Sequence, residues 1–260
     1  MGIINTTPDS FYEGSRFMFV DQILRQAERM LKDGADILDI GGQSTRPGSD
    51  RLPISEEKER VLPSIEALNM HFPEAIISID TFHAAVASEA VNAGASIVND
   101  ISGGNFDNDM LATVGSLGVP YVCMHTKGTP QDMQEHAQYD DICRELLDYF
   151  IKKIEDCRKA GISDVIIDPG FGFAKNIRHN FELLRNLTVF HMLDCPVMAG
   201  LSRKSTIYKT LGTDAAGALN GTTVMNTVAI LNGANILRVH DVKEAKEAVI
   251  LISEMNQSGK

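Results

Sequence analysis

The sequence predicts a single α/β domain, residues 1–260, folded as a (β/α)8 barrel of the TIM-barrel class. Short β-branched apolar runs alternate with longer segments of helical period along the whole chain. No linker rich in Gly and Ser interrupts this alternation. Because the short runs are almost continuously apolar, they are typical of parallel strands buried on both faces. Repeated β-then-α units of this kind favour one closed barrel.

The expected strands are short runs dominated by Ile, Val and Leu, each ending in polar residues. They are Gly2–Asn5, Asp36–Ile40, Ala75–Asp80, Ser96–Asp100, Pro120–His125, Asp164–Asp168, Pro196–Gly200 and Asn235–His240. An open doubly wound sheet is the alternative arrangement of such units. The absence of a GxGxxG turn after the first strand weakens that alternative.

Amphipathic segments between these runs predict the helices. They include Asp21–Lys32, Ser55–His71, Ala84–Ala93, Tyr139–Arg158, Phe181–Leu193 and Val242–Met255. Asp21 and Ser55 are plausible N-cap residues, because their side-chain oxygens can accept from free helix N–H groups. Helices are expected to end at Gly34, Gly94, Gly161 and Gly233, each of which directly precedes an expected strand.

Composition excludes several classes of function. The formal net charge of -11 disfavours a nucleic-acid binder, which needs a basic surface. No apolar run approaches the roughly 20 residues that span a bilayer, so no membrane association is expected. The sequence does not open on a basic segment followed by an apolar one, and its four cysteines form no CxxC pair. A cytoplasmic protein with reduced thiols is therefore expected.

Polar residues gather where the expected strands end. These residues are Asn5, Asp39, Asp80, Asn99, Asp100, Met124 with His125, Asp168, Arg238 and His240, and the loop after the seventh strand adds Ser202, Arg203, Lys204 and Ser205. A single strand-end Asp or Asn often only caps the next helix. Capping does not explain why carboxylates and amides occur at six strand ends together with the basic side chains of Lys204, Arg238 and His240. In a barrel these ends meet at one mouth, where such enzymes keep their active sites.

Three loops stand out at this mouth. The stretches Asn5–Phe11 and Gly41–Ser49 are rich in Gly, Pro, Ser and Thr, and loops of this kind in a compact barrel are usually functional lids. Asp168–Asn176 places glycines and phenylalanines beside a carboxylate, which suits a flat aromatic ligand.

Arg238 and His240 precede a helix expected to start near Asp241, an arrangement that suits a diphosphate. The stretch GLSRKS lacks the glycine and lysine spacing of a nucleotide-triphosphate loop.

Taken in order, these motifs resemble those of the dihydropteroate synthase family across essentially the whole chain. The matching stretches are MGIINTTPDSF, DIGGQSTRPG, SIDTF, VNDISGG, CMH, DPGFGFAKN, GLSRK and RVHDV. The resemblance implies condensation of 6-hydroxymethyl-7,8-dihydropterin diphosphate with 4-aminobenzoate, giving 7,8-dihydropteroate and pyrophosphate. It also implies a homodimer, and small molecules as the only other partners.

The resemblance further implies a role for each matching residue. Asn5 would be the protein ligand of Mg²⁺, with diphosphate oxygens and water completing the shell. Arg238 and His240 would hold the diphosphate. The pterin would be hydrogen-bonded by Asp80, Asn99, Asp168 and Lys204, with Ile101 and Met124 against its faces. The 4-aminobenzoate pocket would comprise Phe11, Pro47, Phe173, Lys204 and Ser205, with Thr45 and Arg46 as further substrate-binding residues. The implied catalytic set is Asp80, Asp168, Lys204, Arg238 and His240.

The implied chemistry separates charge, since the C–O bond of the pterin methylene can break before the amine attacks. Mg²⁺, Arg238 and His240 would stabilise the departing diphosphate, and Asp80 with Asp168 the cationic pterin. The chain departs from the family pattern at Glu13, where Asp is common. It also carries His83 in place of a common Lys and Gln43 in place of a common Glu.

Three other functions remain open from the residues alone. Pterin-binding corrinoid methyltransferases share the barrel, although they need neither a diphosphate site nor a 4-aminobenzoate pocket. A Schiff-base aldolase would use Lys204, with the adjacent Arg203 lowering its pKa. A non-catalytic pterin-binding protein would have no use for Asn5, Arg238 and His240.

Overall fold

The computed structural model of the chain describes residues 1–6, 16–43 and 51–258, with the backbone alone at 16–18. Six parallel strands pair in sequence order as β1 (Gly2–Asn5), β2 (Ile37–Gly41), β3 (Ile76–Asp80), β4 (Ile97–Asp100), β5 (Tyr121–Met124) and β6 (Val165–Asp168). A second parallel pair consists of β7 (Met198–Ala199) and β8 (Ile236–Leu237).

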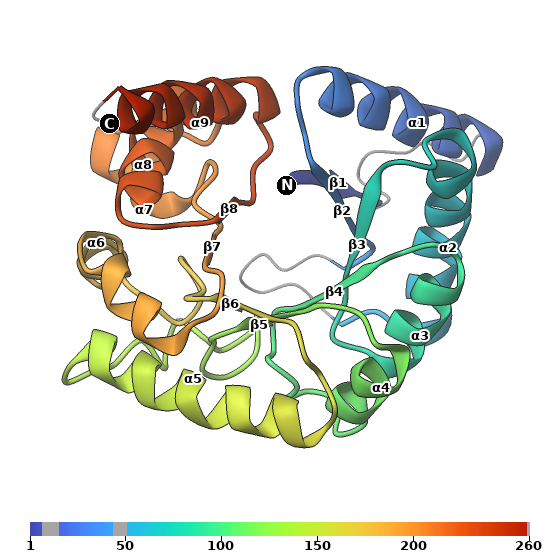
Figure 1. Cartoon of the computed structure of the whole chain (residues 1–260), viewed down its shortest axis with the longest axis horizontal. Coiled ribbons are helices and arrows are strands. Elements are labelled where there is room, and N and C mark those ends of the chain that lie inside the picture. Colours follow the sequence, from blue (N-terminus) through green and yellow to red (C-terminus); the bar gives the residue numbers. More distant parts are fainter. Residues whose placement is uncertain (7–15, 44–50, 259–260) are drawn as a thin grey trace.

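Backbone contacts at both ends of the short pair close the barrel. Ile167 bridges to Val197 between β6 and β7, and Gly2 bridges to Val239 between β8 and β1. The Ile3 N–H donates to the Val239 carbonyl at 2.9 Å, and the Val239 N–H donates to the Met1 carbonyl at 2.9 Å. The strands therefore form a ring surrounded by helices (Figure 1). This ring confirms the predicted (β/α)8 barrel and excludes the open sheet.

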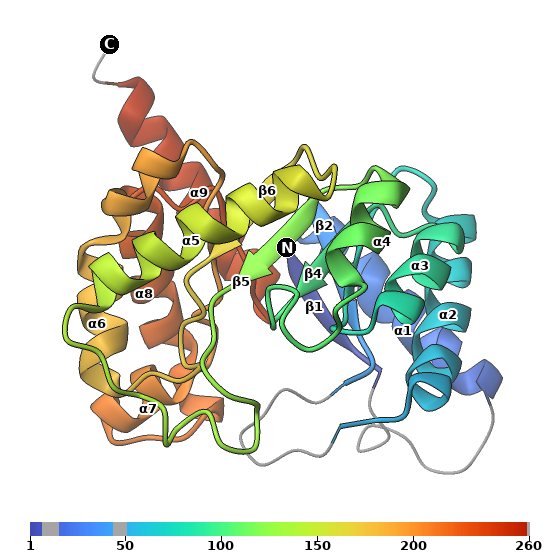
Figure 2. The same cartoon turned by 90° about the horizontal axis from the view of Figure 1, so that it is seen from below.

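The helices form a layer outside the strands, with α1 to α4 on one side and α5 to α9 on the other (Figure 2). Their bounds are α1 (Arg16–Lys32), α2 (Ile54–His71), α3 (Ala84–Asn92), α4 (Met110–Leu117), α5 (Ile142–Lys159), α6 (Ile177–Arg185), α7 (Ser205–Leu211), α8 (Leu219–Leu231) and α9 (Val242–Gln257), with 3-10 helices η2 (Leu187–Leu193) and η3 (Ala216–Ala218). The four expected glycines each lie two residues after the end of a helix and have positive φ, at 95° for Gly34, 123° for Gly94, 90° for Gly161 and 91° for Gly233.

Both predicted N-caps are wrong. Asp21 lies inside α1, and Ser55 lies inside α2, whose N-cap is Pro53. Proline fixes φ near the helical value, so it can precede a helix without a side-chain cap. The segment expected as one helix over Phe181–Leu193 divides at Asn186, whose side-chain amide donates to the Glu182 carbonyl at 2.9 Å.

The barrel interior changes character along the strands. At their N-terminal ends an apolar cluster fills the space, formed by Met1, Ile97, Val122, Ile166 and Met198. At the C-terminal ends the buried side chains are mostly polar, and they include Asp39, Asp80, Asn99 and Asp168. A larger apolar cluster lies between the strands and the helices. Apolar packing thus supports the barrel from below and outside, and leaves the mouth polar.

Gly115 gives a test of how closely the helical layer packs. A Cβ placed at Gly115 in α4 would lie 1.8 Å from the backbone oxygen of Ala160, at the end of α5. Because a backbone atom cannot move aside as a side chain can, we expect Gly115→Ala to lower the free energy of unfolding by about 1–3 kcal/mol. This loss outweighs the gain in helix propensity of up to about 1 kcal/mol. Urea unfolding measures it. Ser116→Ala, exposed on the same helix, should stay within about 0.5 kcal/mol of wild type.

Glu57 gives a pH test, because this α2 carboxyl group is fully buried and neither oxygen has a hydrogen-bond partner. Burial raises its pKa from 4.5 to about 7, and nearby Thr81 and Arg60 only partly oppose this shift. Between these two pKa values the folded protein keeps a proton on Glu57 that the unfolded chain releases. The free energy of unfolding of the wild-type protein therefore falls as pH rises from 4.5 toward 7. We expect Glu57→Gln to gain on wild type by on the order of 2 kcal/mol between pH 5 and pH 8. A pH-independent difference in unfolding free energy would contradict this.

Candidate active site

Arg238, which follows β8, makes two ion pairs across the barrel mouth. Its Nε donates to Asp39 Oδ2 at 2.6 Å, and one terminal nitrogen donates to Asp80 Oδ2 at 2.5 Å. The Asn99 side-chain amide donates to the Asp39 carboxylate at 3.2 Å and 3.4 Å. These four residues, from β2, β3, β4 and the end of β8, are referred to below as the mouth cluster. The cluster brings Asp80, Asn99 and Arg238 together as the sequence predicted.

Burial governs the charges of the mouth cluster. Burial and the neighbouring carboxylate of Asp39 raise the pKa of Asp80, and the ion pair with Arg238 lowers it. The raising effects are larger, and the pKa of Asp80 is about 7. Burial opposes the charge on Arg238, but Asp39 and Asp80 outweigh it and raise the pKa of the guanidinium. Arg238 therefore stays charged, whereas Asp80 can exchange a proton near neutral pH.

Asp168 and Lys204 lie beside the mouth cluster. The carboxylate of Asp168, at the end of β6, accepts from the Gly170 N–H at 2.8 Å, and burial raises its pKa against the opposing effect of Lys204. Lys204 precedes α7, donates from Nζ to the Phe171 carbonyl, and lies 4.8 Å from the centre of the Phe173 ring. Burial lowers the pKa of Lys204 to about 8, and Asp168 opposes that shift.

An apolar cluster adjoins these polar groups. Ile101, Met124 and Phe82 are buried together, and Phe106 and Phe173 pack against them. The sequence assigned Ile101 and Met124 to the faces of a pterin and Phe173 to the second substrate. The structure places these three side chains in one cluster at the mouth, which offers a flat ring an apolar surface beside hydrogen-bonding groups.

Lys175 supports the loop that carries Phe173. Its buried Nζ lies 3.0 Å from His125 Nδ1, and donates to the Phe173 carbonyl at 2.9 Å and to the His125 carbonyl at 3.4 Å. These contacts give the buried amine three polar partners, and burial lowers the pKa of Lys175 well below its usual value. His125 thus has a hydrogen-bonded structural role beside this loop.

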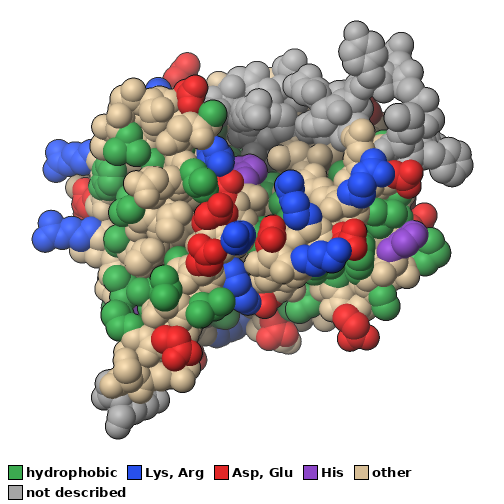
Figure 3. All heavy atoms as spheres, turned by 90° about the horizontal axis from the view of Figure 1, so that it is seen from above, with side chains coloured by type: hydrophobic (Ala, Val, Ile, Leu, Met, Phe, Trp, Pro, Cys, Tyr) green, Lys and Arg blue, Asp and Glu red, His purple; other side chains and the backbone are tan. Residues whose placement is uncertain are grey.

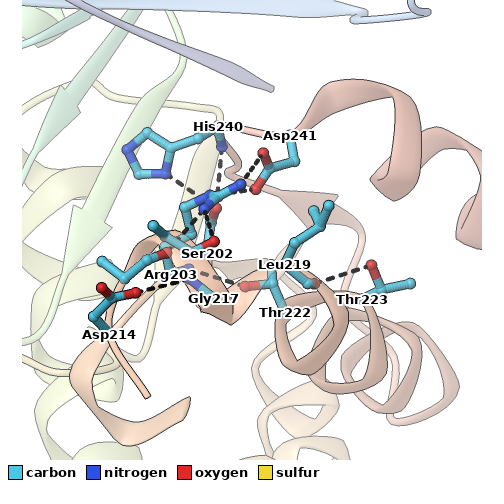
Figure 4. Close-up of polar contacts among 11 residues, drawn as sticks. Ser202, Arg203, Asp214, Gly217, Leu219, Thr222, Thr223, His240 and Asp241 are labelled. Atoms are coloured by element: carbon cyan, nitrogen blue, oxygen red, sulfur yellow. Dashed lines mark hydrogen bonds and ion pairs between the residues drawn. The ribbon is translucent and has the colours of Figure 1, made fainter. Parts of the chain in front are cut away.

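His240 and the loop after β7 are joined by polar contacts (Figure 4). Ser202 Oγ lies 3.0 Å from His240 Nδ1 and accepts from the His240 N–H at 3.2 Å. Arg203 makes a bidentate ion pair with Asp241. Its Nε donates to Oδ2 and its Nη2 donates to Oδ1, each at 2.8 Å. The suggestion that Arg203 lowers the pKa of Lys204 is wrong, because Arg203 pairs with Asp241 and the shift comes from burial and Arg238.

The remaining predicted residues fall into two groups. Asn5 is exposed at the C-terminal end of β1, and Ser205 opens α7 directly after Lys204. Phe11, Glu13, Thr45, Arg46 and Pro47 lie outside the described residues. Within the described ranges no group of three or more His, Cys, Asp or Glu side chains could hold a metal ion.

Two residues at the mouth, Asp39 and Lys175, were given no functional role from the sequence. Asp39 was recognised only as a strand-end residue, yet it accepts from both Arg238 and Asn99. A carboxylate inside an otherwise apolar buried strand was a sufficient signal, since Asp39 is the middle residue of β2. Lys175 gave a weaker signal, because a lysine after a loop usually points to solvent.

Known proteins resemble this chain over nearly its full length. The family described as "Pterin binding enzyme" matches residues 1–240. Dihydropteroate synthase of Escherichia coli K12 is 41% identical over 254 residues, covering 97% of this chain and 89% of that protein.

Solved structures give the same result. Dihydropteroate synthase of Yersinia pestis, in a complex with a sulfonamide drug, superimposes with a TM-score of 0.93 at 40% identity, covering 98% of this chain and 93% of that one. The Xanthomonas albilineans enzyme, solved with 4-aminobenzoic acid, superimposes with a TM-score of 0.91 at 37% identity, covering 98% and 92%. The chain therefore belongs to the pterin-binding enzymes and, within them, to the dihydropteroate synthases.

Proposed function

We propose that this chain condenses 6-hydroxymethyl-7,8-dihydropterin diphosphate with 4-aminobenzoate, giving 7,8-dihydropteroate and pyrophosphate. The observation that carries the proposal is the mouth itself, where the polar side chains of Asp80, Asn99, Asp168 and Lys204 lie beside an apolar cluster that includes Phe173. Such a combination suits a planar ring with a polar edge. The Xanthomonas albilineans relative was solved with 4-aminobenzoic acid, which supports the second substrate. The full-length similarity to synthases disfavours the corrinoid methyltransferase and the aldolase.

The proposed reaction separates charge before the new bond forms. The C–O bond of the pterin methylene breaks with its electron pair leaving on diphosphate, and the amine nitrogen of 4-aminobenzoate then bonds to that carbon and loses a proton. Arg238 and His240, beside the N-terminus of α9, would stabilise the departing anion. Asp80 and Asp168 in their ionised forms would stabilise the cationic pterin. The carboxylate of Asp168 suits the guanidine-like edge of the ring, where two parallel N–H groups can donate.

Mg²⁺ is part of this proposal, with Asn5 as its ligand from protein. The Asn5 side chain is exposed at the C-terminal end of β1, on the side of the mouth. A single amide oxygen suits Mg²⁺, which commonly binds through few protein groups plus phosphate oxygens and water. When bound, the ion supplies positive charge next to the leaving diphosphate.

A homodimer is also proposed. Exposed apolar side chains recur on α6, α7 and α8, which pack against one another. They are Ile177, Phe181, Leu211, Val224 and Leu231. An exposed apolar surface of this kind favours burial against another protein, and symmetric pairing is the commonest solution.

The other expected properties remain part of the proposal. All four cysteines are free thiols, which supports a cytoplasmic location. On the face drawn in Figure 3, Lys and Arg side chains lie among Asp and Glu side chains without a basic area for nucleic acid. Among the described helices, none combines the length and the apolar character needed to cross a bilayer.

Pyrophosphate release tests the proposed reaction. With the pterin diphosphate, 4-aminobenzoate and Mg²⁺ all present, we expect pyrophosphate and dihydropteroate to form in equal amounts. Removing Mg²⁺ with a chelator should slow the release, because the leaving group loses a positive partner. A coupled pyrophosphate assay with chromatography of the pterin product measures both. If no condition releases pyrophosphate, the synthase function is refuted.

Asp168→Asn tests the pterin edge. The substitution keeps the shape but replaces a charged acceptor, so we expect pterin affinity to fall about tenfold to a hundredfold. Fluorescence titration with a non-reactive pterin measures the affinity. Asp164→Asn, at the exposed other end of the same strand region, should bind as wild type does. Unchanged affinity in Asp168→Asn would refute the assignment.

A further inference from the structure

The loops after β7 and β8 are joined by two neighbouring contacts. Ser202 meets His240, and the next residue of each loop, Arg203 and Asp241, forms the bidentate ion pair (Figure 4). We call this pair of contacts the loop clamp. Because consecutive residues on both loops take part, the separation and relative rotation of the two loops are fixed together.

Hydrogen bonds from both the backbone and the side chain of Arg203 hold it in the loop clamp. Its φ is +53°, a left-handed conformation that a non-glycine residue adopts at a cost of order 1 kcal/mol. The Arg203 N–H donates to Thr222 Oγ1 at 3.0 Å, and Nη1 donates to the carbonyls of Ala215 and Ala216 at 2.8 Å and 3.0 Å. These bonds hold a strained turn in which Ser202 reaches His240.

The serine hydroxyl favours one tautomer of a neutral His240 ring, because Nδ1 is the one acceptor that the described residues offer to its proton. Ser202 Oγ already accepts the His240 backbone N–H, and its single proton can be donated to Nδ1. A neutral ring that accepts at Nδ1 must carry its proton on Nε2. Among the described residues, Nε2 has no hydrogen-bond partner, and His240 is exposed at the mouth. An Nε2–H donor is therefore free for a ligand.

The surroundings favour the neutral ring. Partial desolvation of the ring, which is enclosed on one side although the residue reaches solvent, lowers the pKa of His240, as do Arg238, Arg203 and Lys204, and Asp241 opposes them. If the ring gains a proton as negative charge builds up nearby, Nδ1–H can donate to the second lone pair of Ser202 Oγ. Nε2 remains a donor in both states, because the hydroxyl can reverse its hydrogen bond.

We propose that Ser202 is a positioning residue, held by the loop clamp, that keeps the His240 ring with Nε2–H directed at the diphosphate. The inference rests on the proposed function, because it takes the diphosphate as the acceptor. Ser202 itself touches no reacting atom in this scheme. Its contribution depends on the hydroxyl, so an alanine should lose it and a threonine should keep it.

The ring proton is measured directly by two-bond ¹⁵N–¹H correlation spectra of uniformly labelled, ligand-free protein at pH 8. The chain has 7 histidines, and the His240 signals are those that disappear in His240→Asn. We expect the wild-type ring to show an unprotonated Nδ1 and a protonated Nε2. Ser202→Thr should show the same pattern, and Ser202→Ala a mixture of the two tautomers. A wild-type ring protonated mainly on Nδ1 would overturn the proposal without any variant.

Steady-state kinetics supply the second measurement. Losing one oriented hydrogen bond should raise KM for the pterin diphosphate about three- to tenfold in Ser202→Ala and leave KM for 4-aminobenzoate unchanged. Ser202→Thr should restore the wild-type value, and Ser116→Ala serves as the control serine. Equal losses in Ser202→Ala and Ser202→Thr, or a rise in both KM values, would indicate a general structural defect and overturn the proposal. If wild type releases no pyrophosphate, the proposed function fails, while the tautomer spectra still decide whether Ser202 sets the ring.

Discussion

The ion pairs of Arg238 with Asp39 and Asp80 tie the last strand to the second and third across the barrel mouth. A buried carboxylate without a partner costs several kcal/mol, so both aspartates depend on a cationic partner at this position. The guanidinium makes their burial tolerable, and the carboxylates in turn keep a positive charge at the point where a diphosphate would leave. Stability and proposed catalysis therefore draw on the same three side chains. A substitution at any of them disturbs both.

The rest of the architecture serves this arrangement. β7 and β8 have only two residues each in regular pairing, so closure of the ring depends on a few backbone contacts around Val197 and Val239. The apolar cluster beneath, which includes Met198, fills the interior behind the mouth with side chains that exclude water. The polar residues above it are consequently solvated from one side only. That one-sided solvation is the physical cause of the raised pKa values of Asp80 and Asp168 and the lowered pKa of Lys204.

Strand order and the ring of strand-end residues could be predicted from the sequence, because strands buried on both faces appear as continuous apolar runs. Helices α4, α7 and α8 were not among the predicted segments. The first two are too short for a clear period, and α8 carries apolar residues on several sides because it is covered by α7 and α9. The partners of Asp39 and Ser202 could not be predicted, since each contact joins residues far apart in the chain. The second-substrate residues Phe11, Thr45, Arg46 and Pro47 stay predictions.

The three bonds of Lys175 couple two loops mechanically. Its buried Nζ contacts the ring and the carbonyl of His125, after β5, and donates to the carbonyl of Phe173, after β6. A shift of either loop alone would stretch these buried contacts. A ligand that pushes on the Phe173 ring therefore also pushes on the segment next to Met124. If ligands occupy both halves of the mouth as proposed, Lys175 would therefore couple them through the protein even where they do not touch.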